Sequence, residues 1–325
     1  MPLVSVIVPL YNKAPYVLRA LESVAAQAVE DFEVIVVDDG STDGGGDIVA
    51  GIPDSRFRLI RQANAGPGAA RNRGLREARA PYVAFLDADD RWLPNFLSEN
   101  VSILERHPSA AAVSCGWYEH PGNAFPAKWW RDCHIAEGLV TISPATNADH
   151  LVGMIAYTNP STMLARSESV RRWGGFYEAG CRYGEDATLY TRMFLNEPFY
   201  FHARQLATMD VQASELCRNY SSVRPVEPFL LDEGMLFDVC PPPLRAVLAQ
   251  FLKVRACKTA SVLGFWGEWR RANELARRFI SPRDWQTPLF ALAVLSSSPF
   301  VMPIGWAARS LARRGAPAHG GSLRA

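Results

Sequence analysis

The chain has 325 residues, of which 48% are hydrophobic and 21% are charged, so it can build a sizeable core and lacks the composition of a disordered protein. A formal net charge of +1 argues against a protein built mainly to bind nucleic acid. The six cysteines form neither a C-x-x-C pair nor a zinc-binding spacing, which predicts reduced thiols in a cytosolic protein.

Strand and helix patterns alternate along the first part of the chain. Short apolar runs rich in β-branched and aromatic residues predict strands at 4–9, 33–37, 57–60, 82–86 and 110–114. Helical spacing predicts helices between them at 13–28, 68–78 and 93–104. Asn12 is expected to cap the first helix. This order predicts an α/β fold with a mostly parallel sheet and helices on both faces.

The amino-acid composition changes near residue 225. Prolines become frequent there, and basic helical segments that carry tryptophan begin. We therefore predict an α/β domain over 1–225 and a helical C-terminal region over 226–325. Residues 285–308 carry no charge, and three arginines follow within six residues. Three prolines make this stretch a poor spanning helix. Two hypotheses stay open: peripheral association with the cytoplasmic face of a membrane, or a buried helical hairpin.

Three carboxylates, Asp87, Asp89 and Asp90, follow the strand predicted at 82–86. In an open α/β sheet, ligands bind beyond the carboxyl ends of the strands, so these acids are expected to face a cleft. Carboxylates held so close together repel one another unless a cation neutralises them. Mg²⁺ or Mn²⁺ would do so through oxygen ligands and would also hold a diphosphate. The alternative is a solvated acidic turn that caps the next helix.

Two other strand ends carry residues suited to a nucleoside. Tyr11, after the first strand, can pack on a base or ribose, and Asp39, after the second, can accept hydrogen bonds from them. Ordinary turns explain both sequences as well, since Asp-Gly is a strong turn signal. The Gly-rich stretch 64–72 opens a helix, where backbone N–H groups and Arg71 would suit an anion. It matches neither a G-x-G-x-x-G nor a Walker motif.

A pair of acids, Glu185 and Asp186, opens the amphipathic helix predicted after Gly184. Acids in the first turn of a helix are favoured by its dipole without any catalytic role. A carboxylate held near a metal-bound substrate can also act as a general base. The residues alone leave both interpretations open.

Read together, six motifs resemble those of the family 2 glycosyltransferases, in that family's order. They are Val-Ser-Val-Ile-Val-Pro-Leu-Tyr-Asn at 4–12, Val-Val-Asp-Asp-Gly-Ser-Thr-Asp at 36–43, Gly-Ala-Ala-Arg-Asn at 68–72, Phe-Leu-Asp-Ala-Asp-Asp at 85–90, Gly-Gly-Phe at 174–176 and Gly-Glu-Asp at 184–186. The resemblance covers roughly residues 3–205. It implies a GT-A fold with Rossmann-like organisation, a nucleotide-sugar donor, Mn²⁺ or Mg²⁺, and transfer with inversion at the anomeric carbon.

The resemblance implies that seven residues bind the sugar donor: Pro9, Tyr11, Asn12, Asp39, Ser41, Arg71 and Asp87. The first three would line the nucleoside pocket, Asp39 would contact the base, and Ser41 lies in the same turn. Arg71 stands where the family often approaches the base or the diphosphate. Asp87, the first acid of the D-x-D pair, usually reaches the ribose or a metal-bound water.

The same resemblance implies metal and catalytic roles. Asp89, the second acid of the D-x-D pair, would ligate the metal, with Asp87 beside it and Asp90 as a helper. Asp186 would be the general base and Glu185 its neighbour and substitute. Many relatives carry a Tyr-Arg-x-His-like segment near the end of the domain, which is missing here. His202 is therefore a candidate third ligand, the alternative being a half-buried strand histidine.

The acceptor side is less determined by the sequence. Residues 117–150 are predicted to form a long loop. Its aromatic residues can stack on sugar faces or pack the loop onto the domain: Trp117, Tyr118, Trp129, Trp130 and His134.

We predict an inverting glycosyltransferase that moves a sugar from a nucleotide-diphosphate donor, most commonly UDP in this family, to a glycan or lipid-linked glycan. We expect it in the cytoplasm or on the inner face of the plasma membrane. Two alternatives remain. A sugar nucleotidyltransferase should carry a Gly-rich basic loop after the first strand, where this chain has Leu10-Tyr11-Asn12. A non-catalytic glycan-binding protein on the same fold would be expected to lose the metal acids or the base.

Overall fold

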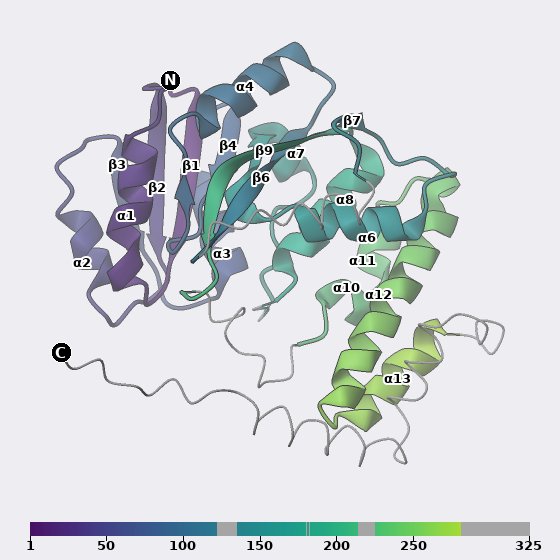
Figure 1. The fold of residues 1–325 in the computed structure, drawn as a ribbon. Helices are drawn as coiled ribbons and strands as arrows, with labels where there is room; N and C mark the ends of the chain where they lie inside the picture. The colour runs from purple at the N-terminus through teal and green to yellow at the C-terminus, as the bar shows by residue number, and fades with distance from the viewer. Residues whose placement is uncertain (122–134, 180, 182, 214–224, 281–325) are drawn as a thin grey trace, which may run out of the picture. The chain divides into compact units, whose positions relative to one another are not determined.

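The computed structural model describes residues 1–121, 135–179, 181, 183–213 and 225–280 (Figure 1). The described residues divide into two compact units, the first comprising those up to 213 together with 225–251, and the second 252–280. Residues 226–251, which the sequence analysis assigned to the C-terminal region, thus belong to the first unit.

A mixed nine-stranded sheet forms the centre of the first unit, within the described residues. The strands are β1 Val4–Leu10, β2 Phe32–Asp38, β3 Phe57–Arg61, β4 Tyr82–Phe85, β5 Arg91–Trp92, β6 Ala112–His120, β7 Gly138–Val140, β8 Met163–Arg166 and β9 Phe199–Asp210. They follow the order β3-β2-β1-β4-β8-β6-β9-β5, and β7 pairs with β9.

The predicted parallel arrangement is confirmed where β1 pairs with β2 and β4, β2 with β3, and β6 with β9. β8 lies between β4 and β6 and runs antiparallel to both, and β5 and β7 run antiparallel to β9. The parallel half of the sheet therefore lies at the N-terminal end of the chain, where the βα alternation is regular.

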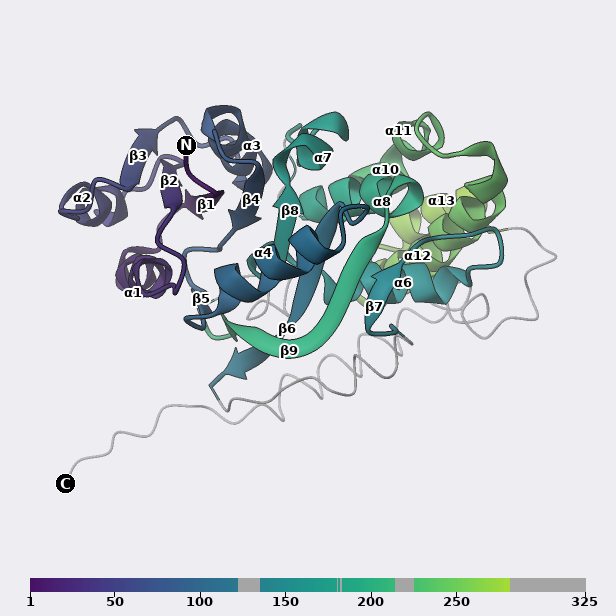
Figure 2. The ribbon, with the colours of Figure 1, turned by 90° about the horizontal axis from the view of Figure 1, so that it is seen from above.

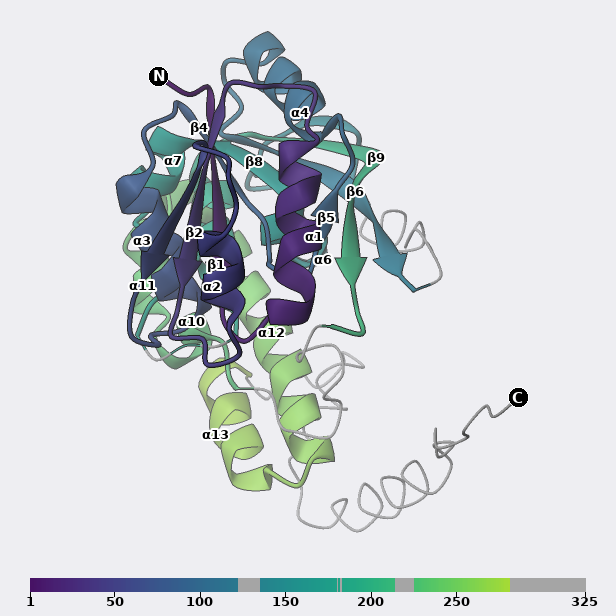
Figure 3. The same cartoon turned by 90° about the vertical axis from the view of Figure 1, so that its left-hand side faces the viewer.

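Helices cover both faces of the sheet. Figures 2 and 3 show α1 and α4 on one face and α3 and α7 on the other. The helices of the first unit are α1 Ala14–Ala25, α2 Gly45–Ala50, α3 Pro67–Glu77, α4 Phe96–Arg106, α6 Ala148–Tyr157, α7 Ser167–Arg172, α8 Glu185–Asn196, α10 Pro228–Leu231 and α11 Gly234–Phe237. α12 Arg245–Phe265 continues into the second unit, which also holds α13 Trp269–Phe279.

The apolar periodicity explains these elements. β1 is fully buried at Val6, Ile7 and Val8, as expected for a central strand with helices on both faces. The helix α1 buries Val17 and Leu21, the face that the sequence predicted.

The predicted cap of α1 is wrong. Lys13, not Asn12, occupies the N-cap position, and Asn12 has a left-handed backbone with φ of 49°. Its side chain instead accepts a hydrogen bond from the Thr42 N–H at 2.9 Å. Asn12 therefore ties two loops together at the ends of β1 and β2.

The predicted loop at 117–150 is partly wrong. β6 continues through Trp117 and Tyr118 and pairs with β9, where Trp117 lies opposite Ala207. Trp117 is buried, with its ring centroid 5.0 Å from that of Tyr157. This ring packs in the core, because β6 continues its pairing with β9 past an irregularity at Gly116 and stays buried through Trp117. Trp129, Trp130 and His134 lie outside the described residues.

No helix among the described residues is long and apolar enough to cross a membrane. The uncharged stretch 285–308, on which the hypothesis of membrane association depends, lies outside the described residues. The cysteines that the structure describes, at 115, 181, 240 and 257, form no disulfide.

Candidate active site

The carboxyl ends of β1, β2 and β4 meet at one edge of the sheet. Leu10 pairs with Asp38 and Ile7 with Phe85, and the Asp39 N–H donates to the Leu10 carbonyl oxygen at 2.8 Å. The loops that follow these strands, 11–13, 39–43 and 86–90, therefore lie together. We call this region the acidic edge. It is where open α/β sheets bind their ligands.

The first two loops of the acidic edge are hydrogen-bonded to each other. The Asn12 N–H donates to Ser41 Oγ at 3.1 Å, which adds to the bond between Asn12 and Thr42. Tyr11 is 45% exposed, so its ring is free to meet a ligand, whereas Pro9 lies half-buried within β1. A cavity of about 370 Å³ opens beside this turn and is lined in part by Ser41.

Asp39 is buried, and its carboxylate accepts three hydrogen bonds from the stretch that leads into α3. They come from Gln62 Nε2 at 2.8 Å, the Ala65 N–H at 2.9 Å and the Gly66 N–H at 2.8 Å. A carboxylate offers about four acceptor positions, so one remains for a ligand. The side chain that the resemblance assigned to the base thus also fixes the Gly-rich loop.

Arg71 connects two acidic motifs that lie far apart in the sequence. It is buried, and it donates from Nη2 to Asp87 Oδ1 at 2.6 Å and from Nη1 to Glu185 Oε1 at 2.8 Å. Burial alone would lower the pKa of Arg71, but the charges of Asp87 and Glu185 outweigh it and hold the pKa above its usual value. Arg71 is therefore a permanent cation between the end of β4 and the start of α8.

The Gly-Ala-Ala-Arg-Asn and Gly-Gly-Phe motifs interlock beside this arginine. Asn72 Nδ2 donates to the Phe176 carbonyl oxygen at 2.7 Å, and the Phe176 N–H donates to Asn72 Oδ1 at 2.9 Å. A Cβ atom at Gly68 would overlap the Tyr177 carbonyl oxygen, and one at Gly175, where φ is +70°, would overlap Asn72 Oδ1. Both glycines are required for this close approach.

Asp186 lies in the first turn of α8, next to Glu185. Burial of the carboxyl and the charge of Glu185 raise the pKa of Asp186 to about 7, against the opposing effect of Arg71. A carboxyl with a pKa near neutrality is suited to general base catalysis. One turn later, the buried Tyr190 hydroxyl has no hydrogen-bond partner among the described residues.

Asp89 carries a protein counter-charge. Its Oδ2 lies 2.7 Å from Lys13 Nζ, which also donates to the Ala213 carbonyl oxygen at 2.6 Å. Burial and the charge of Asp87 nevertheless raise the pKa of Asp89 above its usual value. The sequence analysis did not single out Lys13, although it directly follows the Tyr-Asn of the first motif.

Both carboxylate oxygens of Asp90 accept hydrogen bonds from other residues of the protein. Its Oδ2 accepts from Ser161 Oγ at 2.6 Å and its Oδ1 accepts from the Asp210 N–H at 3.0 Å. Burial raises the pKa of Asp90 well above its usual value. These contacts occupy one acceptor position on each oxygen of Asp90 and tie the acidic turn to Ser161 and to the end of β9. The sequence analysis did not identify Ser161 as a partner of Asp90. The one sequence feature that marks this position is Pro160, which precedes a buried strand.

His202 does not join these acids. Its Nε2 lies 3.0 Å from Asn100 Oδ1, and burial lowers its pKa to about 4. Asp210, which contacts Asp90, stands eight residues further along β9. Over this stretch the paired strand β6 advances six residues, from Ser114 to His120, or roughly 20 Å, which is far more than the reach of a metal ligand. We therefore correct the predicted ligand set by removing His202.

Within the described residues, no group of three His, Cys, Asp or Glu side chains is placed to hold a metal ion. Asp87 and Asp89 offer two sets of oxygen ligands at neighbouring positions. This pair fits Mg²⁺ or Mn²⁺, because such ions are often bound by one or two carboxylates and complete their coordination with water and substrate phosphate.

An open α/β sheet with acids and a Gly-rich loop beyond its strand ends defines the class of nucleotide-binding α/β proteins. The particular family follows from sequence comparison. The sequence model of Glycosyl transferase family 2 matches residues 5–170, and the chain belongs to this family.

One curated relative illustrates this membership. The succinoglycan biosynthesis protein ExoW of Rhizobium meliloti is 48% identical over 119 residues, which are 35% of this chain and 36% of ExoW. The match spans about a third or less of the length of the curated relatives.

Two solved structures share the fold. TarS 1–349 of S. aureus in complex with UDP gives a TM-score of 0.64 at 18% identity, covering 95% of this chain and 92% of TarS 1–349. The mannosyltransferase PcManGT of Pyrobaculum calidifontis, in complex with GDP-Man and Mn²⁺, gives a TM-score of 0.56 at 21% identity. The match covers 95% of this chain and 87% of PcManGT. These likenesses confirm the predicted GT-A fold.

Proposed function

We propose that this chain is an inverting glycosyltransferase that moves a sugar from a nucleotide-diphosphate donor, first of all a UDP-sugar, to a glycan or lipid-linked glycan. The observation that carries this proposal is the Arg71 bridge. One buried cation joins Asp87, at the sugar-donor motif, to Glu185, beside the proposed base Asp186. The proposed donor-binding acid and the proposed base thus belong to one cluster of charged residues around Arg71.

The comparisons support the choice of substrates. One structural neighbour binds UDP and another binds GDP-Man with Mn²⁺, and both share the fold of this chain. A relative with 48% identity is a succinoglycan biosynthesis protein, which supports a polysaccharide acceptor.

Residues of the acidic edge would bind the sugar donor. Tyr11, Pro9 and Asn12 would line the nucleoside pocket together with Ser41, and the remaining acceptor position of Asp39 would meet the base. Asp87 and Asp89 would hold Mn²⁺ or Mg²⁺. The metal would supply stabilisation of the negative charge that develops on the leaving diphosphate.

Asp186 would remove the proton from the attacking acceptor hydroxyl. The new glycosidic bond forms on the face of the anomeric carbon opposite the nucleotide, and the electron pair of the broken C–O bond leaves with the diphosphate. One displacement inverts the configuration and needs no covalent enzyme intermediate. Glu185 is engaged by Arg71 at 2.8 Å, so its role is to position the cluster and not to act as a second base.

A sugar-donor screen tests the proposal. The protein with Mn²⁺ is given a panel of UDP-, GDP- and dTDP-sugars, and released nucleotide diphosphate is counted. We expect slow release from one donor, reduced by about a hundredfold or more in Asp89→Ala. The control Asp31→Ala removes an exposed acid elsewhere and should behave as the native protein.

Calorimetry with Mn²⁺ and nucleotide diphosphates completes the test. If no nucleotide diphosphate binds, the transferase is refuted and the glycan-binding alternative replaces it. If pyrophosphate is released from a nucleoside triphosphate and a sugar phosphate, the nucleotidyltransferase alternative is correct.

A further inference from the structure

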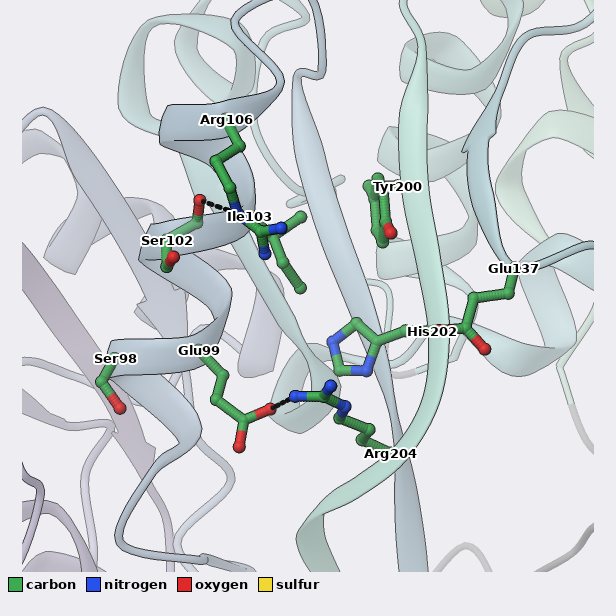
Figure 4. Close-up of a pocket in the computed structure, with 9 residues that line it drawn as sticks. All are labelled: Ser98, Glu99, Ser102, Ile103, Arg106, Glu137, Tyr200, His202 and Arg204. Carbon is green, nitrogen blue, oxygen red and sulfur yellow. Dashed lines mark hydrogen bonds and ion pairs between the residues drawn. The ribbon is translucent and has the colours of Figure 1, made fainter.

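A second cavity, of about 350 Å³, lies away from the acidic edge, between α4 and β9. We call it the α4–β9 groove, and its size falls within the range of small-ligand pockets. Its lining residues are Ser98, Glu99, Ser102, Ile103, Arg106, Glu137, Tyr200, His202 and Arg204 (Figure 4). The proposed transfer reaction uses none of them.

The groove is built by two regular elements. Tyr200, His202 and Arg204 alternate along β9 and so share one face of the strand, whereas Phe199 and Phe201 point into the core. The α4 residues recur every three or four positions, as one helix face requires. Figure 4 shows these two rows facing each other. Most of the lining therefore stands on rigid elements.

The charges of the groove balance. Arg106 and Arg204 supply donors, and Glu99 and Glu137 supply acceptors, with Arg204 Nη1 bound to Glu99 Oε2 at 2.7 Å. Two glutamates would repel an anion and two arginines would repel a cation. Such a lining favours a neutral ligand that both donates and accepts hydrogen bonds, and sugar hydroxyls do both.

His202 adds an unsatisfied polar atom to this groove. The residue is 2% exposed, its Nε2 lies beside Asn100 Oδ1, and its Nδ1 has no hydrogen-bond partner among the described residues. A buried polar atom without a partner is rare and is costly to leave unmatched. The half-buried ring of Tyr200 offers an apolar face beside it.

From the balanced charges, the unpaired imidazole nitrogen and the adjacent ring, we infer that the α4–β9 groove binds a segment of neutral glycan. The choice of a glycan rests on the proposed function. β9 carries His202 of the groove and Asp210 beside the acidic edge, and over this stretch the paired strand β6 advances six residues, from Ser114 to His120, or roughly 20 Å. Only a polymeric acceptor can reach both. The groove thus holds a chain section remote from the reacting end.

Binding of neutral oligosaccharides to the full chain tests this inference. The probes are glucose, galactose and N-acetylglucosamine oligomers of increasing length, and the readout is isothermal titration calorimetry with saturating UDP and Mn²⁺. We expect one of these probes to bind, and Arg106→Ala and Glu137→Gln each to weaken that binding by about tenfold. Both residues are exposed, so the variants should fold.

A matched control locates the binding. Arg76→Ala removes an exposed arginine from the last turn of α3, as Arg106→Ala does from α4, and should leave the affinity unchanged.

Three results would overturn the inference: no oligosaccharide binding, binding insensitive to both groove variants, or displacement of the oligosaccharide by inorganic phosphate. Sugar-donor hydrolysis without oligosaccharide binding refutes the groove alone. Oligosaccharide binding without metal-dependent nucleotide binding refutes the transferase alone.

Discussion

The acidic turn 87–90 has two flanks, and cations neutralise them in different ways. On one flank, Arg71 is buried and holds Asp87 and Glu185 with both ends of its guanidinium. On the other, Lys13 is 19% exposed at its side chain and holds Asp89 with a single ammonium group. The first flank cannot lose its cation without leaving buried charge unpaired. The second can exchange its lysine for a metal ion.

This difference suggests that Arg71 serves to position the carboxylates, whereas Lys13 affects how the site binds a metal ion. A planar guanidinium fixes two carboxylates at once, whereas an ammonium on a flexible chain acts as a point charge. We therefore expect changes on the Arg71 flank to affect catalysis and stability, and changes on the Lys13 flank to affect metal affinity. Five predictions, made on four variants, test this partition.

The largest expected effect is on the Arg71 flank, at Asp186. Asp186→Asn removes the proposed base and should lower the turnover rate by about 10²–10⁴-fold. Because the base must be ionised and burial raises its pKa to about 7, native kcat/KM should rise as pH increases through this value. The variant should lack this step. A native profile flat from pH 5 to 8 would contradict the assignment.

The same variant changes the pH dependence of stability. The pKa of Asp186 is raised in the folded state above an unfolded value of about 3.9, so the folded state binds more protons between these two values. Native stability should therefore fall as pH rises from about 4 to 7 through this group, and Asp186→Asn should remove that part of the fall. Urea unfolding at several pH values measures both slopes.

Arg71→Met should have the next largest effect. It leaves Asp87 and Glu185 without their shared counter-charge, and breaking a buried ion pair costs about 3–5 kcal/mol of unfolding free energy. The matched control is Arg73→Met on the same helix, where the side chain is 41% exposed and pairs with Glu77, and where we expect a loss of less than about 0.5 kcal/mol. Equal losses in urea unfolding would show that Arg71 does not hold the site.

Lys13→Met tests the opposite flank. The methionine keeps the length of the side chain but removes the charge that competes for Asp89, so Mn²⁺ should bind about tenfold tighter, a gain of about 1.4 kcal/mol. Mn²⁺ titration followed by electron paramagnetic resonance measures this without substrate. Lys258→Met makes the same change in net charge at an exposed position in α12 and should have no effect. Weaker binding in Lys13→Met would make the lysine a partner of the metal site and not its competitor.

The smallest effect is expected for Asp90→Asn. Both oxygens of Asp90 accept hydrogen bonds within the protein, and burial raises its pKa, so a neutral isostere should suit the position. We expect Mn²⁺ affinity within about twofold of native and stability within about 1 kcal/mol. A tenfold loss of affinity in the Mn²⁺ titration would instead make Asp90 a ligand.

Local pattern was enough to predict much of the fold. The strands β1, β2 and β4 are mostly buried runs and β3 is a half-buried edge strand, and the order of these strands and their helices predicted the parallel pairing. The antiparallel strand β8 is only four residues long, and no periodicity in four residues reveals its direction. The end of β6 was missed because its partner β9 lies about 90 positions later in the chain.

The acids of the site could be named from the sequence, but their partners could not. Arg71 and Glu185 are 114 positions apart, and nothing in either motif says that they meet. The same holds for Lys13 and Asp89, which are 76 apart. His202 was misplaced for the same reason, because residue type suggested a ligand and only the path of β9 shows where its ring lies.

The interlock of Asn72 with Phe176 has a consequence for folding. It closes a loop of about a hundred residues, as does the bond between Arg71 and Glu185, and long loops close late because their entropic cost precedes any gain. The helix α3 can form early, yet Arg71 and Asn72 gain their partners only when the later half of the domain docks. A fragment ending at residue 170, where the family match ends, would carry the D-x-D motif without the contacts that organise it.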